Sequence, residues 1–244
     1  MDRHPTAIVE PGAEVGEGTS LGPYAIVGAG ARVGPDCALH AHAIVAPGAV
    51  LGARNRVFSF AVIGGAPQHK RHAGAPAGLV VGDGNTFREH VTVHAGTERA
   101  TTIGSDNLLM VGVHVGHDVR VGARCTLANG VQLAGHVEVE DDVTFGGLAA
   151  VAQFVRIGQG AFVAGGAMVE RDVPPFVIAQ GDRARVRVLN VVGLRRMGVP
   201  AASIAELERV FRALWIAKRR PSEVTTTDPW ASRLLAARSP SSKI

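Results

Sequence analysis

From Val9 to Val169 the chain places a large apolar residue at every sixth position, apart from two interruptions. A six-residue period matches neither the 3.6-residue repeat of an α-helix nor the two-residue alternation of an ordinary strand. It predicts a hexapeptide-repeat parallel β-helix, in which each repeat forms one short strand and one turn. The positions in phase are Val9, Val15, Leu21, Val27, Val33, Leu39, Val45, Leu51, Val57, Ile63, Val81, Phe87, Val93, Ile103, Leu109, Val115, Val121, Leu127, Leu133, Val139, Phe145, Val151, Ile157, Val163 and Val169.

Chains with this repeat resemble the left-handed parallel β-helix family, whose coils form a triangular prism with three hexapeptides in each coil. The resemblance implies an all-β prism with the large residue pointing inward and a small residue, two positions earlier, at a corner. It also implies assembly as a homotrimer with active sites between subunits. Small residues at the earlier position include Ala7, Ala13, Ala25, Ala31, Ala43 and Ala49.

Two segments lack the period, residues 64–80 and 94–102. We expect both to leave the prism as loops, and functional residues often concentrate on loops of a rigid scaffold. The prism is then expected over 1–175, followed over 176–244 by a connector and a basic α-helical C-terminal domain that is frayed at its end. One helical stripe is predicted from residue 200 onward. It consists of Ile204, Leu207, Val210, Phe211, Leu214 and Trp215.

The composition indicates a soluble protein of a reducing compartment, and we expect a cytoplasmic location. The sequence contains 31 glycines, which suits many tight turns, and only two cysteines, which lie in unrelated contexts. Neither a disulfide framework nor a CxxC metal site is therefore expected. The N-terminus lacks the apolar segment of a signal peptide, and no apolar run is long enough for a membrane span.

Charge is unevenly distributed along the chain. Residues 183–244 contain 13 Lys and Arg against 4 Asp and Glu, a net charge of +9, whereas the preceding residues carry a net charge of −5. The basic segment predicts an anionic partner: a nucleic acid, a phosphorylated substrate or an acidic protein. A solvated, arginine-rich helix face is the plainer alternative. No nucleic-acid recognition motif accompanies Trp215 and Trp230, so a nucleic-acid partner is not expected.

Histidines gather at one predicted corner of the prism. With three hexapeptides per coil, residues 18 apart stack at roughly 4.8 Å, so His117, Gly135 and Gln153 form a column. Further histidines flank this column on either side, beside both predicted loops. The residues brought to this edge are His94, His114, His117, Asp118, Gly135, His136 and Gln153.

This column suggests general-base catalysis. His117 is the candidate base because a neutral imidazole accepts a proton near neutral pH, and Asp118 is placed to orient it. The N–H of Gly135, one coil onward, is a candidate oxyanion donor. The absence of a Ser or Cys nucleophile in the column favours direct transfer to a bound hydroxyl. The plainer interpretation is that these histidines occupy turns and contact solvent or a neighbouring subunit.

Longer stretches resemble the bacterial acyl-ACP:UDP-N-acetylglucosamine O-acyltransferases, which catalyse the first step of lipid A synthesis. The resemblance extends from about residue 4 to residue 220. The matching stretches are HPTAIVEPGAEVGEG near the start, FREHVTVHAGT, NLLMVGVHVGHDVRVGARCTLANGVQLAGHVEV over 107–139, GGLAAVAQFVRIG, RDVPPFVIAQG and NVVGLRRMG.

The resemblance implies a role for each site residue. His117 would remove the proton from the glucosamine 3-hydroxyl with support from Asp118, while Gly135 stabilises the oxyanion. Acyl carrier protein would be the acidic partner and its phosphopantetheine thioester the co-substrate, with no other cofactor and no metal. The substrate-binding residues implied are Gln68 and Arg71 for the sugar nucleotide, His94, His114, His136 and Gln153 for the sugar and pantetheine cleft, Gly165 for the acyl chain, and Asn190 and Arg196 for the nucleotide end.

Several recognition positions depart from the family pattern. The first loop reads PQHKRH, so that histidines replace the usual aspartate and tyrosine, and other positions differ farther along the chain. A paralogue that acylates another sugar nucleotide, such as a 3-amino sugar, is therefore an alternative. The departures are His69, His72, Ala152, Val192 and Met197.

Two further alternatives use the same prism. A metal enzyme like the γ-class carbonic anhydrases would bind Zn²⁺ through three histidines. However, the histidine pair of that class is five residues apart, whereas His114 and His117 are three apart. A catalytically silent scaffold is the other alternative.

Overall fold

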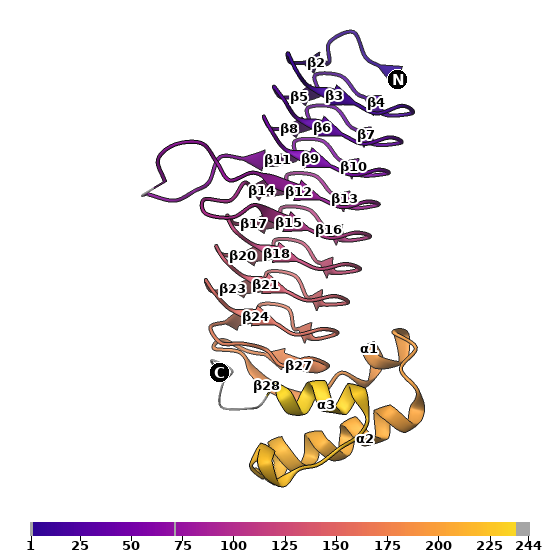
Figure 1. Cartoon of the computed structure of the whole chain (residues 1–244), viewed down its shortest axis with the longest axis vertical. Helices are drawn as coiled ribbons and strands as arrows, with labels where there is room; N and C mark the ends of the chain where they lie inside the picture. The colour runs from indigo at the N-terminus through magenta and orange to yellow at the C-terminus, as the bar shows by residue number, and fades with distance from the viewer. Residues whose placement is uncertain (1, 71, 238–244) are drawn as a thin grey trace.

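The six-residue repeats form a long parallel β-helix with helices at its C-terminal end (Figure 1). The structure is a computed structural model that describes residues 2–70 and 72–237. The fold class predicted from the sequence, a left-handed parallel β-helix followed by a small helical part, is confirmed. Parallel pairing between residues mostly 18 apart, such as Val115 with Leu133, gives the predicted coil length.

Three sheets form the sides of the prism within the described residues. The first sheet contains β1 (Asp2–Arg3), β4 (Ser20–Leu21), β7 (Ala38–Leu39), β10 (Arg56–Val57), β13 (Thr86–Phe87), β16 (Leu108–Leu109), β19 (Thr126–Leu127), β22 (Thr144–Phe145), β25 (Phe162–Val163), β27 (Val177–Gln180) and β28 (Arg185–Leu189). The second contains β2 (Ile8–Val9), β5 (Ile26–Val27), β8 (Ile44–Val45), β11 (Val62–Gly65), β14 (Thr92–His94), β17 (His114–Val115), β20 (Gln132–Leu133), β23 (Ala150–Val151) and β26 (Met168–Val169). The third contains β3 (Glu14–Val15), β6 (Arg32–Val33), β9 (Val50–Leu51), β12 (Leu79–Val81), β15 (Thr101–Ile103), β18 (Arg120–Val121), β21 (Glu138–Val139) and β24 (Arg156–Ile157).

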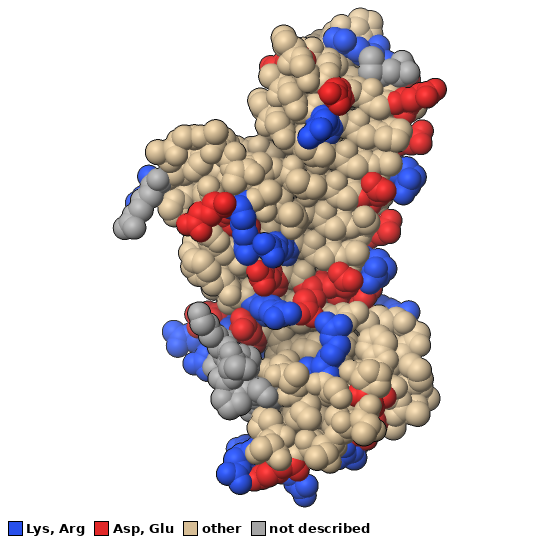
Figure 2. All heavy atoms as spheres, in the orientation of Figure 1, with Lys and Arg blue, Asp and Glu red and all other residues tan. Residues whose placement is uncertain are grey.

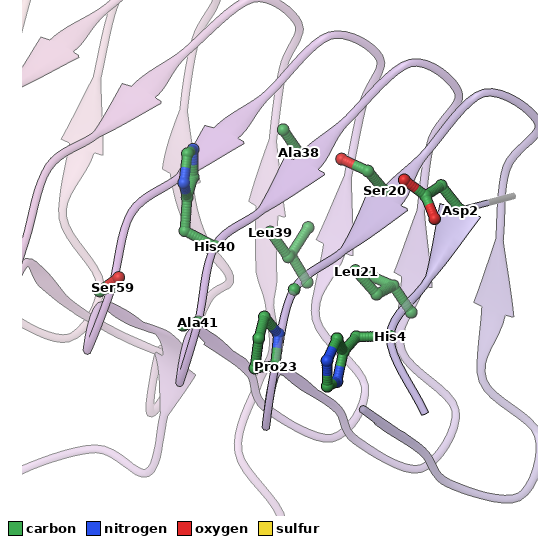
Figure 3. Close-up of a pocket in the computed structure, with 11 residues that line it drawn as sticks. Asp2, His4, Ser20, Leu21, Pro23, Ala38, Leu39, His40, Ala41 and Ser59 are labelled. Carbon is green, nitrogen blue, oxygen red and sulfur yellow. The ribbon is translucent and has the colours of Figure 1, made fainter. Parts of the chain in front are cut away.

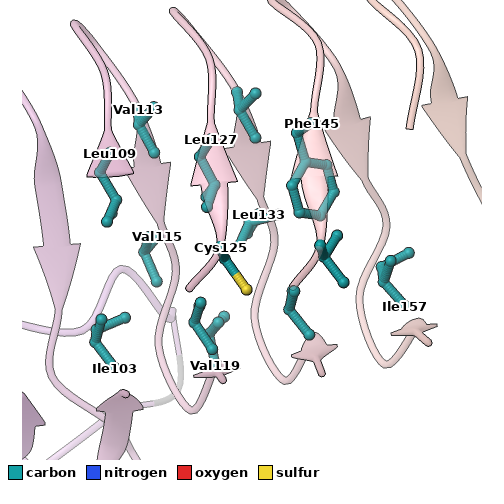
Figure 4. Packing of buried hydrophobic residues seen from close by; sticks show 14 of the residues in the cluster. Ile103, Leu109, Val113, Val115, Val119, Cys125, Leu127, Leu133, Phe145 and Ile157 are labelled. Atoms are coloured by element: carbon teal, nitrogen blue, oxygen red, sulfur yellow. The ribbon is translucent and has the colours of Figure 1, made fainter. Parts of the chain in front are cut away.

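The apolar residue of each repeat fills the centre of the prism. Figure 4 shows Leu109, Leu127 and Phe145 of the first sheet stacked beside Val115 and Leu133 of the second, and all five are buried. Burying such a side chain contributes roughly 1.5–3 kcal/mol. The pattern therefore stabilises a stiff scaffold, from which the corner turns and loops project.

One corner, between the third and first sheets, contains a buried polar ladder. The amide oxygen of Asn85 accepts hydrogen bonds from the backbone N–H and the side-chain amide of Asn107, at 3.0 and 2.9 Å. Asn85 in turn donates in the same two ways to the amide oxygen of Asn55. Each buried amide is satisfied by the coil next to it, which fixes the register of successive coils.

The first sheet continues past residue 175, where we expected the prism to end. β27 pairs in parallel with β25 and antiparallel with β28. The helical part follows: α1 (Val191–Arg196), α2 (Ala201–Phe211), a short π-helix η1 (Arg212–Ile216), a short 3₁₀ helix η2 (Pro221–Glu223) and α3 (Pro229–Ala236).

The predicted helical stripe spans α2 and η1. Instead of the fraying expected toward the end of the chain, the described part closes with α3, because Asp228 accepts a hydrogen bond from the N–H of Ala231 and caps it. The predicted fraying also concerns residues 238–244, which lie outside the described part of the chain.

Candidate active site

The candidate base lies at the corner between the second and third sheets. After β17 the chain turns through residues 116–119 before it enters β18. Asp118 has a φ of 61° and His136, in the next coil, a φ of 63°. These left-handed conformations are sparsely populated by residues other than glycine, and Asp and His are among those that tolerate them best. The turn leaves Asp118 fully buried and His117 only 4% exposed.

The loop between β14 and β15 wraps around the Asp118 carboxylate. One carboxylate oxygen accepts hydrogen bonds from the backbone N–H groups of Thr97, Glu98 and Arg99, at 3.1, 3.0 and 2.9 Å. The other accepts from the Thr97 hydroxyl at 2.7 Å and from the Thr97 N–H at 3.0 Å. A carboxylate with this many donors is held in one orientation.

The environment of Asp118 keeps it ionised. Burial alone raises the pKa of this carboxyl, but hydrogen bonds from the Arg99 N–H, from His117 and from Thr97 outweigh it and hold the pKa far below its ordinary value. Asp118 is therefore negatively charged at neutral pH and acts only as an acceptor.

Asp118 fixes the tautomer of His117. The two side chains meet at 2.7 Å between Nδ1 of His117 and a carboxylate oxygen of Asp118. Because a carboxylate only accepts, Nδ1 must carry the proton when the imidazole is neutral, which leaves Nε2 with its lone pair free to accept a proton. This is the arrangement of a histidine general base held by a carboxylate.

Gly135 lies directly against the His117 ring. A Cβ atom at this position would lie 2.6 Å from Cε1 and 2.7 Å from Nε2 of His117, closer than such atoms approach in proteins. Among the described residues, no backbone or side-chain group accepts a hydrogen bond from the Gly135 N–H. A free donor beside the base suits stabilisation of an oxyanion.

Replacing Gly135 by alanine is expected to lower kcat by roughly 100-fold, because the new methyl group displaces the base from its reactive position. KM for the acceptor should change much less. Steady-state kinetics of Gly135→Ala checks this, with Gly147→Ala as a matched control whose Cβ would lie no closer than 3.4 Å to its neighbours. Equal kcat values for the two variants would contradict the assignment of Gly135 to the site.

The other predicted histidines surround this pair. The His136 ring stands at 90° to the His117 ring with centroids 5.2 Å apart. His114 lies in the same coil as His117, next to His94 of the preceding coil, and burial and the neighbouring His94 lower the pKa of His114. His69, from the loop between β11 and β12, meets the His117 ring edge-on at 5.2 Å. Histidines from three coils and one loop thus converge at a single corner.

The remaining predicted residues are distributed more widely. Gln153 is exposed one coil beyond Gly135, and Gln68 is exposed on the β11–β12 loop. Gly165 lies at another corner, between the first and second sheets. Arg71 lies outside the described residues.

Asn190 and Arg196 lie at a third corner. Asn190 donates a hydrogen bond to the Gly160 carbonyl at 2.9 Å, in the turn between the third and first sheets, and caps α1 by accepting from the Gly193 N–H. Arg196 is exposed at the end of α1. Within a single chain, Asn190 and Arg196 therefore lie at a different corner from His117.

The side chains of His117, Asp118 and His136 suit a hydrogen-bonded site better than a catalytic zinc site. Potential ligand atoms of His117, Asp118 and His136 lie within 4.8 Å of one another. However, both carboxylate oxygens of Asp118 are already occupied by hydrogen-bond donors, which leaves two histidines of this set. A catalytic zinc site requires three protein ligands and an open position.

Some residues of the site were not predicted from the sequence as members of it. Thr97 and Arg99 hold Asp118 from 21 and 19 residues away, and the Phe154 ring stacks on His136 with centroids 4.7 Å apart. In the sequence, His69 stands out only as a departure from the family pattern. The sequence indicates these residues only through the predicted position of their loops beside the histidine column, because contacts made by loops are not periodic.

Two profiles of known protein families match parts of this chain. A profile of bacterial transferase hexapeptide repeats matches residues 100–135. A second profile, described as UDP N-acetylglucosamine O-acyltransferase, domain 2, matches residues 172–227. Together with the prism and its corner site, these matches place the chain among the hexapeptide-repeat transferases.

Individual relatives and solved structures are similar to this chain over most of its length. An acyl-[acyl-carrier-protein]--UDP-N-acetylglucosamine O-acyltransferase of Janthinobacterium sp. (strain Marseille) is 51% identical over 87% of this chain and 82% of the relative. The crystal structure of the UDP-N-acetylglucosamine O-acyltransferase of Moraxella catarrhalis superposes with a TM-score of 0.92 at 34% identity, covering 97% of this chain and 96% of that one. The Arabidopsis UDP-N-acetylglucosamine acyltransferase gives 0.89 at 30% identity, with 98% of both chains covered. The chain belongs to the acyl-[acyl-carrier-protein]--UDP-N-acetylglucosamine O-acyltransferase family.

No helix among the described residues has both the length and the apolar character needed to cross a membrane.

Proposed function

We propose that the protein transfers a 3-hydroxyacyl group from acyl carrier protein to the glucosamine 3-hydroxyl of UDP-N-acetylglucosamine, the first step of lipid A biosynthesis. The observation that carries this proposal is the Asp118-held His117 ring beside the free N–H of Gly135. The two substrates are proposed from the family to which the chain belongs. His117, Asp118 and Gly135 are the groups proposed to carry out their reaction.

The reaction follows from this geometry. Nε2 of His117 takes the proton of the 3-hydroxyl as its oxygen attacks the thioester carbonyl. The carbonyl oxygen becomes an oxyanion, which the Gly135 N–H stabilises. The tetrahedral intermediate then collapses to the ester, and the leaving thiolate takes the proton back from His117. Asp118 stabilises the imidazolium in between, and no cofactor other than the phosphopantetheine thioester is needed.

The acidic partner is proposed to dock near the C-terminal helices. Residues 183–244 carry a net charge of +9, which complements acyl carrier protein. Figure 2 shows basic and acidic residues side by side on the visible face of the prism near the helices. Because residues 1–182 carry a net charge of −5, the excess positive charge belongs to the C-terminal segment. A cytoplasmic location is proposed with this partner, and the two free, buried cysteines, Cys37 and Cys125, suit such a compartment.

A homotrimer is proposed because two sides of the prism suit contact with another copy and the third suits water. The outward residues of the second sheet, from β2 to β26, include no Lys, Arg, Asp or Glu, and Ile8 is 50% exposed among them. From β1 to β25 the outward residues of the first sheet are mostly uncharged, apart from Asp2 and Arg56, and a hollow of about 530 Å³ lies there beside small residues such as Ser20 and Ala38 (Figure 3). The third sheet presents charged residues such as Arg120 and Glu138. Uncharged surfaces favour subunit contacts, and charged ones favour solvent.

The trimer also completes the site. His117 lies at the corner between the second and third sheets, while Arg196 lies near the corner between the third and first. Packing the second sheet of one copy on the first sheet of the next brings these two corners toward each other. The base would then come from one subunit and the nucleotide-binding residues from its neighbour.

The acceptor is tested by offering two sugar nucleotides. Purified protein is incubated with 3-hydroxyacyl carrier protein and either UDP-N-acetylglucosamine or its 3-amino analogue, and products are identified by mass spectrometry. An O-acylated UDP-N-acetylglucosamine is the expected product. Reaction with the 3-amino analogue alone would instead assign the protein to the paralogue that His69 suggests. No acylated product from either acceptor would contradict the proposal.

A further inference from the structure

Four aromatic rings project from the corner between the first and second sheets. Tyr24, His42, Phe60 and His90 occupy the same turn position in four successive coils. Each ring stacks on the next, with centroids 5.1, 5.0 and 5.3 Å apart and planes within 12° of parallel. All four residues are exposed, and Tyr24 and Phe60 are 55% and 52% exposed. These residues form a ring column that is fixed by its own stacking and open on its outer side.

The backbone of the ring column is unusual for such large residues. All four have left-handed φ angles, of 57°, 61°, 63° and 61° in chain order. Bulky residues seldom adopt this conformation, whereas glycine adopts it freely. Farther along the same corner, glycines take the position in three coils: Gly112, Gly130 and Gly166. Large side chains kept in a left-handed conformation often mark a functional place.

The corner that holds the active site shows the same relation between left-handed φ and function. In its first three coils the position is taken by glycine, as at Gly12 and Gly48. The larger residues with left-handed φ lie at the site itself, namely Asp118, His136 and Phe154. The ring column is therefore a second place along the prism where large residues replace glycine, and we looked for its partner.

The ring column lies between the two sheets that are proposed for subunit contacts. Beside it, the outward residues of the second sheet are apolar: Ile8, Ile26, Ile44 and Val62. In the four turns that carry the rings, the two charged residues, Arg88 and Glu89, pair with each other at 3.0 Å. The rings thus continue an uncharged surface, which suits a protein partner of the same character.

Threefold symmetry fixes what lies opposite the ring column. When the second sheet of each copy packs on the first sheet of the next, the corner between these sheets points to the axis in all three copies. The rings stack along the prism at roughly the strand spacing of 4.8 Å, so each presents its edge outward rather than its face. The edges of three equivalent rings then meet at each level of the axis.

We infer that the ring column is the surface on which three copies of this chain meet at the trimer axis, and that it sets the register of the trimer. The inference rests on the trimer of the proposed function. If one copy were shifted by one coil, its His90 would lie level with Gly112 of another copy, so only the unshifted trimer matches every ring with its equivalents. Because the ring column and His117 lie at different corners, the column affects acyl transfer only through assembly.

Size-exclusion chromatography with light scattering tests this inference on the full-length protein at pH 8. The wild type is expected at three times the 25.3 kDa of one chain. Phe60→Glu brings three carboxylates together at the axis, so this variant is expected to elute as a monomer and to lose nearly all acyl transfer. Val80→Glu is the matched control and should remain trimeric, because Val80 is 47% exposed on the third sheet. A trimeric Phe60→Glu protein, or equal dissociation of Val80→Glu, would overturn the inference.

Phe60→Gly separates the loss of a contact from the loss of the fold. Glycine suits the left-handed φ of 63° at this position, so each subunit should fold as well as the wild type. The protein concentration at which half of the trimer dissociates should rise about tenfold or more. Circular dichroism of the diluted samples reports whether the prism persists. A midpoint concentration equal to that of the wild type would count against the ring column.

Failure of this inference and failure of the proposed function give different results. A wild-type trimer that transfers the acyl group, together with Phe60 variants that stay trimeric, overturns only the role of the ring column. A wild-type trimer that acylates neither sugar nucleotide counts against the proposed function, while dissociation of the Phe60 variants would still support the ring column. A monomeric wild type contradicts both the ring column as an axial contact and the shared active site.

Discussion

His117→Ala is expected to lower kcat for acyl transfer by about 1,000-fold, within the range that general-base catalysis supplies. The Asp118 hydrogen bond leaves Nε2 of His117 as the only acceptor of that ring. The thioester should still bind, so KM should change little. Single-turnover kinetics with 3-hydroxyacyl carrier protein and UDP-N-acetylglucosamine measures the chemical step directly.

Two control variants make this result specific. His4→Ala removes an exposed histidine near the N-terminus and should leave kcat unchanged. His136→Ala removes the ring that stands perpendicular to the base and should reduce kcat by much less than His117→Ala. A His117→Ala enzyme within tenfold of wild type, or a His136→Ala enzyme that is equally impaired, would refute the choice of base.

Asp118→Asn is expected to lower the free energy of unfolding by about 3 kcal/mol and kcat by at least 100-fold. The asparagine retains one acceptor oxygen, and its NH₂ group replaces the other. If it replaces the oxygen that faces the loop, it meets the N–H donors of Thr97, Glu98 and Arg99 and cannot accept from them. If it replaces the other oxygen, it meets the Thr97 hydroxyl and Nδ1 of His117 instead. The Asp118 site is fully buried, so water cannot replace the lost partners. Urea unfolding of wild type and variant at pH 7 measures the first effect, and steady-state kinetics measures the second.

The stability difference between wild type and Asp118→Asn should depend on pH. The pKa of Asp118 is depressed in the folded protein, so its stabilising contribution is complete above the unfolded-state pKa of about 4. It is lost progressively as the pH falls below that value toward the folded-state pKa. The stability difference between wild type and Asp118→Asn should therefore be constant near neutrality and narrow below about pH 4. A difference that stays constant down to pH 2 would show that Asp118 does not contribute through its charge.

The prism was predictable from the sequence because its repeat is strictly local. Every in-phase residue from Leu21 to Val169 lies in the buried core, so the period predicts the strands. The three hexapeptides per coil that the family resemblance implies add the corners and the stacking of Gly135 over His117. The partners of Asp118 were not predictable in this way. Thr97 and Arg99 reach it from an aperiodic loop, whose course depends on tertiary hydrogen bonds.

The C-terminal region shows a second limit of the sequence pattern. The helical stripe from Ile204 was clear, but α3 has only eight residues and depends on contacts with distant parts of the chain. Trp230 packs on Phe176 and Arg233 bonds Glu140, which lies 93 residues earlier. Short helices of this kind owe their stability to docking rather than to helix propensity. The same reasoning explains why Asn190 and Arg196 were assigned to the site without any indication that they lie at another corner.

The proposed active site is shared between subunits, with His117 from one copy and Arg196 from the next. Mixed trimers of His117→Ala and Arg196→Ala subunits test this directly, and acyl transfer is the measured quantity. Each variant alone should be nearly inactive, whereas an equimolar co-assembled mixture should regain about one quarter of wild-type activity, because random assembly restores one interface in four. If both residues act within one chain, the mixture contains no intact site, and activity no higher than that of the separate variants would contradict the account.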